Sequence, residues 1–197
     1  MTDASAFYGI GGAWYPEEHD SASWPEYARL MGAAGLRVAR IGEFAWDRME
    51  PRESVYDFQW LEAAFALLEA RGIRALLCTP TAVPPRWACA AYPDINPVLE
   101  NGRAMGFGGR RYTCPTSPNY LRLGEAIAGA MGARFGTDRR VMGWQLDNEF
   151  GHPFCFCDRC LGEFQAWCAR RFRTIDRFND ALVMSFWGQT LTDFDQV

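Results

Sequence analysis

Apolar segments alternate along the chain with segments in which apolar residues recur at helical spacing. The apolar segments predict β-strands at residues 7–14, 36–41, 73–78 and 141–146. The periodic segments predict helices from Ser23 to Gly35, from Asp57 to Gly72 and from Ser117 to Gly136. Each predicted helix ends at a glycine, a residue that commonly terminates helices because it tolerates a left-handed backbone. The alternation indicates βα units and a parallel sheet.

Local signals support each of these helices. Ser23 and Glu26 have the spacing of a capping box, in which the two side chains cap the first turn reciprocally. Ser117 followed by Pro118 is a second helix start, because proline fits the first helical turn. The helix that begins at Asp57 has an apolar face, and this face predicts its buried residues: Leu61, Ala64, Phe65 and Leu68.

The alternation is interrupted between the third and fourth predicted strands. Residues 79–119 contain most of the 11 prolines of the chain and a glycine-rich stretch at residues 102–109. This composition predicts a long irregular loop that continues to the start of the next helix. A loop of this length inside a compact domain is often functional.

Polar side chains follow every predicted strand. They are Glu17, Glu18 and His19 after the first, Glu43 after the second, Arg86 and Arg110 after the third, and Asn148 and Glu149 after the fourth. Ligands of parallel α/β sheets bind beyond the carboxyl ends of the strands. We therefore expect these side chains to gather at one edge of the sheet.

The number of units suggests a fold. A (β/α)8 TIM barrel has about 250 residues and eight βα units, whereas four strands are predicted here. We therefore expect an α/β fold that is a partial TIM barrel of about the first four units. Residues 1–197 would form a single domain, the N-terminal half of a catalytic barrel.

Glu149 is a candidate general acid. It follows an apolar strand and stands next to an amide, Asn148, at the expected mouth of the sheet. Partial burial at such a place would raise the pKa of the carboxyl toward neutrality, as a general acid requires. A solvated glutamate that merely ends the strand is the alternative, and the residues alone favour it because a single carboxylate is a weak signal.

Three closely spaced cysteines predict a metal site. Cys155, Cys157 and Cys160 form a C-x-C-x2-C run, and tetrahedral zinc needs a fourth ligand. Cys114, in the long loop, is the favoured fourth ligand because it also lies just past the carboxyl end of a strand. His152 is the alternative. Cys168 lies on the following predicted helix beside aromatic residues and is expected in the core.

Composition and charge exclude several classes of function. The net charge of −4 and the pI near 5.3 argue against a nucleic-acid partner. All basic residues are arginine, and the absence of lysine excludes Schiff-base chemistry and a GxxxxGK[ST] phosphate loop. No apolar run approaches the ~20 residues that cross a bilayer, and residues 1–6 lack the pattern of a secretory signal. We expect a cytoplasmic protein without a membrane partner.

Four segments of the chain closely resemble one family of enzymes. They are residues 11–17 (GGAWYPE), 40–46 (RIGEFAW), 144–151 (WQLDNEFG) and 155–160 (CFCDRC). In this order they resemble the N-terminal half of glycoside hydrolase family 42, β-galactosidases with a TIM-barrel catalytic domain. The resemblance spans nearly the whole chain, through residues 186–188.

The resemblance implies roles for particular residues. It implies that Glu149 is the catalytic acid/base, that Asn148 binds the sugar near its 2-hydroxyl, and that Arg110 binds substrate. Arg40 and Glu43 match family positions that we expect to support the site. The implied ligands of a structural zinc ion agree with the spacing argument: Cys114, Cys155, Cys157 and Cys160.

The resemblance also implies a missing part. The nucleophile of the family is a second glutamate at the end of the seventh strand, and a retaining glycosidase needs two carboxyls about 5 Å apart. We therefore expect a fragment of an enzyme that hydrolyses terminal β-D-galactose residues, inactive alone and trimeric at full length. The alternatives are a non-catalytic, zinc-stabilised sugar-binding domain or an inactive truncated product.

Overall fold

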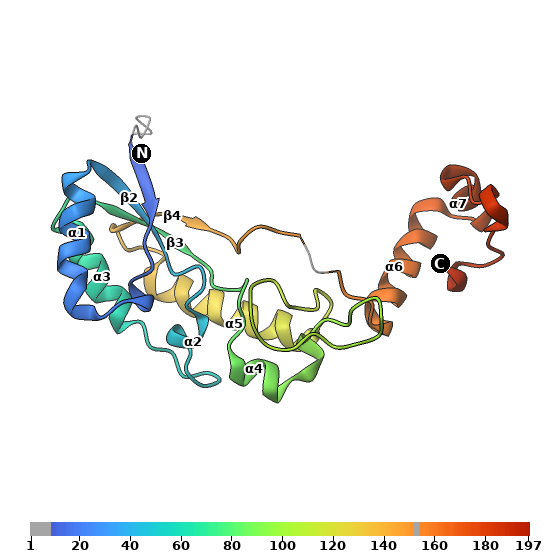
Figure 1. Ribbon diagram of the computed structural model, residues 1–197, viewed down its shortest axis with the longest axis horizontal. Helices are drawn as coiled ribbons and strands as arrows, with labels where there is room; N and C mark the ends of the chain where they lie inside the picture. Colours follow the sequence, from blue (N-terminus) through green and yellow to red (C-terminus); the bar gives the residue numbers. More distant parts are fainter. Residues whose placement is uncertain (1–8, 152–153) are drawn as a thin grey trace.

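In the computed structural model, which describes residues 9–151 and 154–197, the four predicted strands form one parallel sheet (Figure 1). They are β1 (Ile10–Ala13), β2 (Leu36–Ile41), β3 (Arg74–Cys78) and β4 (Val141–Gln145). Their order in the sheet is β1-β2-β3-β4. Successive strands are therefore neighbours, as in the wall of a (β/α)8 barrel, and all four carboxyl ends lie at the same edge.

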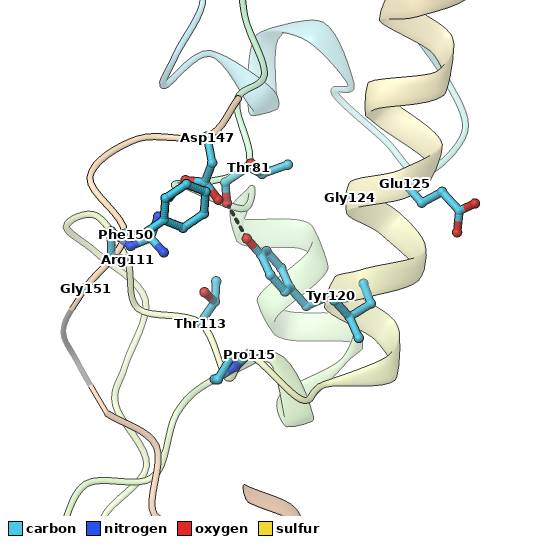
Figure 2. Close-up of a pocket in the computed structure, with 11 residues that line it drawn as sticks. Thr81, Arg111, Thr113, Pro115, Tyr120, Gly124, Glu125, Asp147, Phe150 and Gly151 are labelled. Atoms are coloured by element: carbon cyan, nitrogen blue, oxygen red, sulfur yellow. Dashed lines mark hydrogen bonds and ion pairs between the residues drawn. The ribbon is translucent and has the colours of Figure 1, made fainter. Parts of the chain in front are cut away.

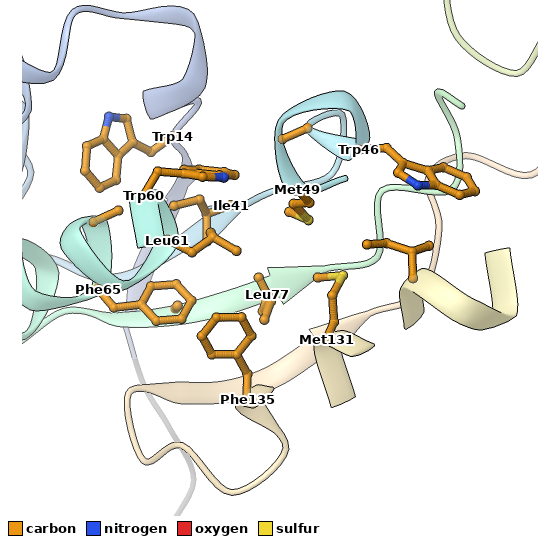
Figure 3. Close-up of a cluster of buried hydrophobic side chains, with 14 of the residues drawn as sticks. Trp14, Ile41, Trp46, Met49, Trp60, Leu61, Phe65, Leu77, Met131 and Phe135 are labelled. Atoms are coloured by element: carbon orange, nitrogen blue, oxygen red, sulfur yellow. The ribbon is translucent and has the colours of Figure 1, made fainter. Parts of the chain in front are cut away.

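Three helices connect these strands and pack on the sheet. They are α1 (Trp24–Ala33), α3 (Gln59–Glu69) and α5 (Pro118–Phe135), which confirms the three predicted helices. Around Ile41 and Leu77 lie Leu61 and Phe65 of α3 and Met131 and Phe135 of α5, all fully buried in one core (Figure 3). Each large apolar side chain buried in this way stabilises the fold by about 1.5–3 kcal/mol.

The predicted face of α3 is confirmed. The structure buries all four of its residues, which are Leu61, Ala64, Phe65 and Leu68. From α5, Phe135 packs edge-on against Phe65, with ring centroids 5.4 Å apart. The helical period thus identified the core correctly, because only one side of each helix faces the sheet.

One predicted helix cap is confirmed and one is wrong. Ser117 Oγ accepts a hydrogen bond from the Tyr120 N–H at 3.1 Å and caps α5. Ser23 does not cap α1, because a 3-10 turn, η2 (Ser21–Ser23), precedes this helix and holds Ser23 in a helical conformation. The Ser23 hydroxyl instead donates to the Asp20 carbonyl at 2.6 Å, and Glu26 forms an ion pair with Arg29.

The loop after β3 is more ordered than predicted. It contains a short helix, α4 (Arg86–Ala91), and a 3-10 turn, η3 (Pro93–Ile95). The buried hydroxyl of Tyr112 anchors it by donating to the Pro84 carbonyl at 2.6 Å. A helix of six residues is too short to show a period in the sequence.

The remaining elements surround or extend this unit. α6 (Asp158–Phe172) and α7 (Ile175–Leu182) follow β4 and stand apart from the sheet (Figure 1). The short elements are η1 (Pro16–Glu18), α2 (Trp46–Met49), η4 (Phe186–Gly188) and η5 (Phe194–Gln196). Within the described part of the chain, no helix combines the length and the apolar character needed to cross a membrane.

Gly42, just past β2, provides a test of packing at the sheet edge. Its φ is +93°, and a Cβ there would lie 2.8 Å from Cε of the fully buried Met49. We expect Gly42→Ala to lower the free energy of unfolding by about 1 kcal/mol more than Gly102→Ala, because the clashing Cε can shift but is buried. Gly102 also has a positive φ, +78°, but open space around it, so it controls for backbone strain. Equal losses in urea unfolding would contradict this account.

Candidate active site and metal centre

A buried carboxylate, Glu43, joins three strands at their carboxyl ends. Arg40 on β2 binds it through two nitrogens, Nε to Oε2 and Nη2 to Oε1, both at 2.9 Å. The Tyr15 hydroxyl, after β1, donates to the same Oε1, and Gln145 Nε2 on β4 lies 3.4 Å from Oε2. Glu43 is only 2% exposed, so the guanidinium and the hydroxyl replace the water that it loses. This is the geometry that a supporting role for Arg40 and Glu43 requires.

The segment that follows β4 is a strained turn. Asp147 and Glu149 have φ values of +57° and +45°, and neither is glycine. Such a backbone costs about 1–2 kcal/mol per residue. The turn is held by the Asp147 N–H, which donates to Thr79 Oγ1 at 2.7 Å, and by the Asp147 carbonyl, which accepts from Gln145 Nε2 at 2.9 Å.

The turn places the candidate acid and the candidate sugar-binding amide in different environments. Asn148 is 5% exposed, and its Nδ2 is buried without a hydrogen-bond partner among the described residues. The side chain of Glu149 is 66% exposed and pairs with Arg110, with Oε2 and Nη1 2.9 Å apart. Glu149 is therefore not buried by the described residues, contrary to the expectation from its position after an apolar strand.

Arg111 is a residue of this site that the sequence analysis missed. Its Nη1 donates to Asp147 Oδ1 at 2.6 Å and to the Asn148 carbonyl at 2.7 Å. Its guanidinium also lies over the Phe150 ring, 5.1 Å from the centroid. The only signal in the sequence was its place next to Arg110.

A cavity of about 390 Å³ lies beside the turn (Figure 2). Arg111, Asp147 and Phe150 line one side of it, and Tyr120 from α5 lines the other. The Tyr120 hydroxyl donates to the Thr81 carbonyl at 3.1 Å, which fixes this wall. Glu149 and Asn148 are not among the lining residues, so the cavity is separate from the candidate acid.

The four predicted metal ligands come together. The sulfur atoms of Cys114, Cys155, Cys157 and Cys160 all lie within 4.8 Å of one another. Cys114 Sγ is 3.8 Å from Cys157 Sγ and 3.5 Å from Cys160 Sγ. Four thiols at this spacing could hold a tetrahedral metal ion. His152, the alternative ligand, lies outside the described residues.

Hydrogen-bond donors surround the cysteine cluster. The Val98 N–H donates to Cys155 Sγ at 3.3 Å, and the Thr116 hydroxyl lies 3.1 Å from Cys160 Sγ. Burial tends to raise the pKa of Cys157, but the Cys160 N–H and the neighbouring thiols lower that pKa to about 7. Burial, and then hydrogen bonds to the neighbouring thiols, raise the pKa values of Cys155 and Cys160. Among these three cysteines, the surroundings of Cys157 favour the thiolate, the form that binds metals.

Comparison with known proteins identifies the family. A family model described as Beta-galactosidase matches residues 13–197. The chain belongs to glycoside hydrolase family 42. It is 41% identical over 191 residues to "Beta-galactosidase BgaA" of Thermus sp, covering 95% of this chain and 30% of that protein. It is 38% identical to "Beta-galactosidase BgaH" of Haloferax lucentense, with 95% and 29% covered.

Solved family 42 structures share this fold. The β-galactosidase from Halorubrum lacusprofundi superposes with a TM-score of 0.88 at 36% identity, covering 96% of this chain and 29% of that one. The enzyme from Rahnella sp. R3 superposes with a TM-score of 0.90 at 32% identity, covering 98% and 29%. The chain thus spans about 30% of the length of the curated family 42 relatives it matches.

Within the family 42 chain, the structure brings the expected residues together in two groups. Asn148 and Glu149 lie in the turn after β4, where Arg110 from the loop after β3 contacts Glu149. The four cysteines form the cluster described above. Cys168 is buried, as expected. Trp46, the last residue of the family-like segment 40–46, belongs to the hydrophobic core. Its side chain is fully buried in α2 and donates to Glu50 Oε2 at 2.7 Å.

Glu17, in the loop after β1, is an unusual carboxyl in this family 42 chain. Both of its oxygens are buried without a hydrogen-bond partner among the described residues. Burial raises its pKa from 4.5 to about 7; repulsion from Glu18 and Asp47 adds to this, and the Glu17 N–H and Arg48 oppose it. Glu17 is therefore largely protonated in the folded protein below neutral pH.

Glu17 predicts a pH-dependent stability. Between pH 4.5 and about 7 the unfolded carboxyl ionises while the folded one keeps its proton, so stability falls as the pH rises through this window. We expect Glu17→Gln to raise the thermal unfolding midpoint at pH 8 but not at pH 4, by up to about 3 kcal/mol in free energy. Glu18→Gln, at the exposed neighbour, should show little difference. A pH-independent effect of Glu17→Gln would rule out this assignment.

Proposed function

We propose that this chain forms the first half of the (β/α)8 catalytic barrel of a β-galactosidase and contributes its acid/base, Glu149. The substrate is a β-galactoside with a terminal, non-reducing galactose. The observation that carries the proposal is the buried, unpartnered Nδ2 of Asn148, directly beside a carboxyl that reaches solvent. A buried amide donor without a partner is costly, and a substrate hydroxyl would satisfy it.

The proposed reaction is a double displacement. Glu149 protonates the glycosidic oxygen as the galactose–oxygen bond breaks, while a second carboxylate attacks the anomeric carbon. Glu149, now ionised, then removes a proton from the water that releases galactose. We place the second carboxylate in the remaining units of the barrel, at the end of its seventh strand.

Arg110 is proposed to bind substrate. Its Nη1 lies 2.9 Å from Glu149 Oε2. Both side chains are more than half exposed, so the pair exchanges partners easily. When Arg110 turns to a sugar hydroxyl, the Glu149 carboxyl is free to approach the glycosidic oxygen. Asn148 meanwhile donates from Nδ2 to the 2-hydroxyl of the sugar.

The cysteine cluster is proposed to hold a structural zinc ion. Four thiols with backbone and hydroxyl donors around them fit the ligand set of a closed zinc site. Cys114 comes from the loop after β3, and the other three ligands come from the segment after β4. A bound ion would join these two segments, which also carry Arg110 and Glu149.

Replacing Glu149 tests the acid/base role. In active protein that contains this chain, Glu149→Ala should reduce lactose cleavage far more than the formation of glycosyl-enzyme from a nitrophenyl galactoside, because nitrophenolate leaves without protonation. The intermediate should then accumulate. Added azide, which needs no general base, should restore turnover and yield a β-galactosyl azide.

The control for this test is Glu163→Ala, at an exposed glutamate of α6. Normal lactose cleavage by Glu149→Ala would favour a glutamate that merely ends the strand and a non-catalytic sugar-binding domain. Formation of the α-azide would make Glu149 the nucleophile instead. Both outcomes would overturn the proposed role.

Metal analysis tests the zinc site. Purified protein should contain about one zinc ion per chain, and Cys157→Ser should lower this content because one thiolate ligand is lost. Cys168→Ser should retain the metal, because Cys168 is buried outside the cluster. Metal-free protein with four titratable thiols at the cluster would contradict the proposal.

A further inference from the structure

We infer that Arg111 is a positioning residue which, together with Asp147, holds the Asn148–Glu149 turn in its reactive conformation. The inference rests on the proposed role of Glu149. Arg111 is distinct from its neighbour Arg110: it touches the backbone and the carboxylate of the turn, whereas Arg110 touches the candidate acid itself.

The turn needs such support because its backbone is strained. Asp147 and Glu149 have left-handed φ values on either side of Asn148. Non-glycine residues persist in this conformation only where surrounding contacts hold them. Glu149 cannot supply the restraint, because its own ion pair is open to solvent.

The Arg111–Asp147 pair restrains Asn148 at both of its backbone groups. The Asn148 N–H donates to Asp147 Oδ1 at 2.5 Å, and the Asn148 carbonyl accepts from Arg111 Nη1 at 2.7 Å. The ion pair between Arg111 Nη1 and Asp147 Oδ1, at 2.6 Å, closes this ring of contacts. The ring fixes the peptide from which the side chains of Asn148 and Glu149 project.

The Arg111–Asp147 ion pair is more buried than the Arg110–Glu149 ion pair. The side chains of Arg111 and Asp147 are 17% and 13% exposed, against 53% and 66% for Arg110 and Glu149. Water competes poorly for a buried ion pair, so the Arg111–Asp147 pair keeps its geometry, while the exposed Arg110–Glu149 pair can exchange its partners. Arg111 thus restrains the turn, while its neighbour Arg110 is free to change its partner.

Arg111 is itself anchored in the loop after β3. Its N–H donates to the Ala82 carbonyl at 2.8 Å, and its guanidinium lies over the Phe150 ring. Figure 2 shows Arg111 and Asp147 meeting at one wall of the cavity beside the turn. The loop after β3 therefore controls the geometry of the residues that follow β4.

The test compares two substrates in active protein that contains this chain. Arg111→Met should lower kcat for lactose by about tenfold or more, because a displaced acid protonates the leaving oxygen poorly. The loss for a nitrophenyl galactoside should be several times smaller. Arg111→Lys should recover most of the lactose rate, since one nitrogen makes both of the Arg111 contacts.

A second variant covers the case in which Arg111→Met does not fold. Asp147→Asn retains an oxygen for the Asn148 N–H but loses the charge that binds Arg111, and it should show the same bias against lactose. The matched control is Arg122→Met. Arg122 also pairs with a carboxylate, Glu53 at 2.9 Å, and lies over a ring, that of Tyr92.

The outcomes separate this inference from the proposed function. If Glu149→Ala behaves as an acid/base variant but Arg111→Met keeps the substrate ratio of Arg122→Met, the positioning role alone is wrong. A loss by Arg111→Met that is equal for both substrates and unrelieved in Arg111→Lys would also overturn it. If Glu149→Ala has normal rates, the proposed function fails, and this inference fails with it.

Discussion

Parallel pairing of the four strands in chain order is the constraint on which the site depends. Each strand runs in the same direction as its neighbour, so every segment that follows a strand begins at one edge of the sheet. One residue after each strand shows the result: Tyr15, Glu43, Thr79 and Asp147 follow β1, β2, β3 and β4. Tyr15 hydrogen-bonds Glu43, and Thr79 hydrogen-bonds Asp147, because the strand order brings them together. A different strand order would separate them.

The charged pairs at this edge of the sheet become more exposed from Glu43 to Glu149. Glu43 is enclosed and bound by Arg40 through two nitrogens, the Arg111–Asp147 pair is mostly enclosed, and the Arg110–Glu149 pair is open. Electrostatic contacts strengthen as water is excluded, so the base of the site is the most rigid part. The acid role proposed for Glu149 fits this arrangement, because the backbone of the turn is held in place while the exposed carboxyl can change its partner.

The loop after β3 and the segment after β4 are joined at two places. One is the contact of Arg111 with Asp147 and Asn148, and the other is the cluster of Cys114 with three cysteines that precede or begin α6. Two separate links between the same segments restrict their relative rotation more than one link would. The irregular composition of the loop is compatible with this order, because single contacts such as Tyr112 with Pro84 and Arg111 with Asp147 hold it in place of a regular hydrogen-bond ladder.

The sequence by itself determined the elements whose signal is local. Apolar runs located all four strands, the helical period identified the buried face of α3, and Ser117 capped α5 as its neighbours predict. The C-x-C-x2-C spacing also placed three sulfurs together, because so few residues separate them. Tertiary structure decided the rest. Trp46 is buried in the core, and Arg111 meets Asp147 across 36 positions of the chain. Such contacts depend on which distant segments the sheet brings together, and no local pattern of residues predicts them.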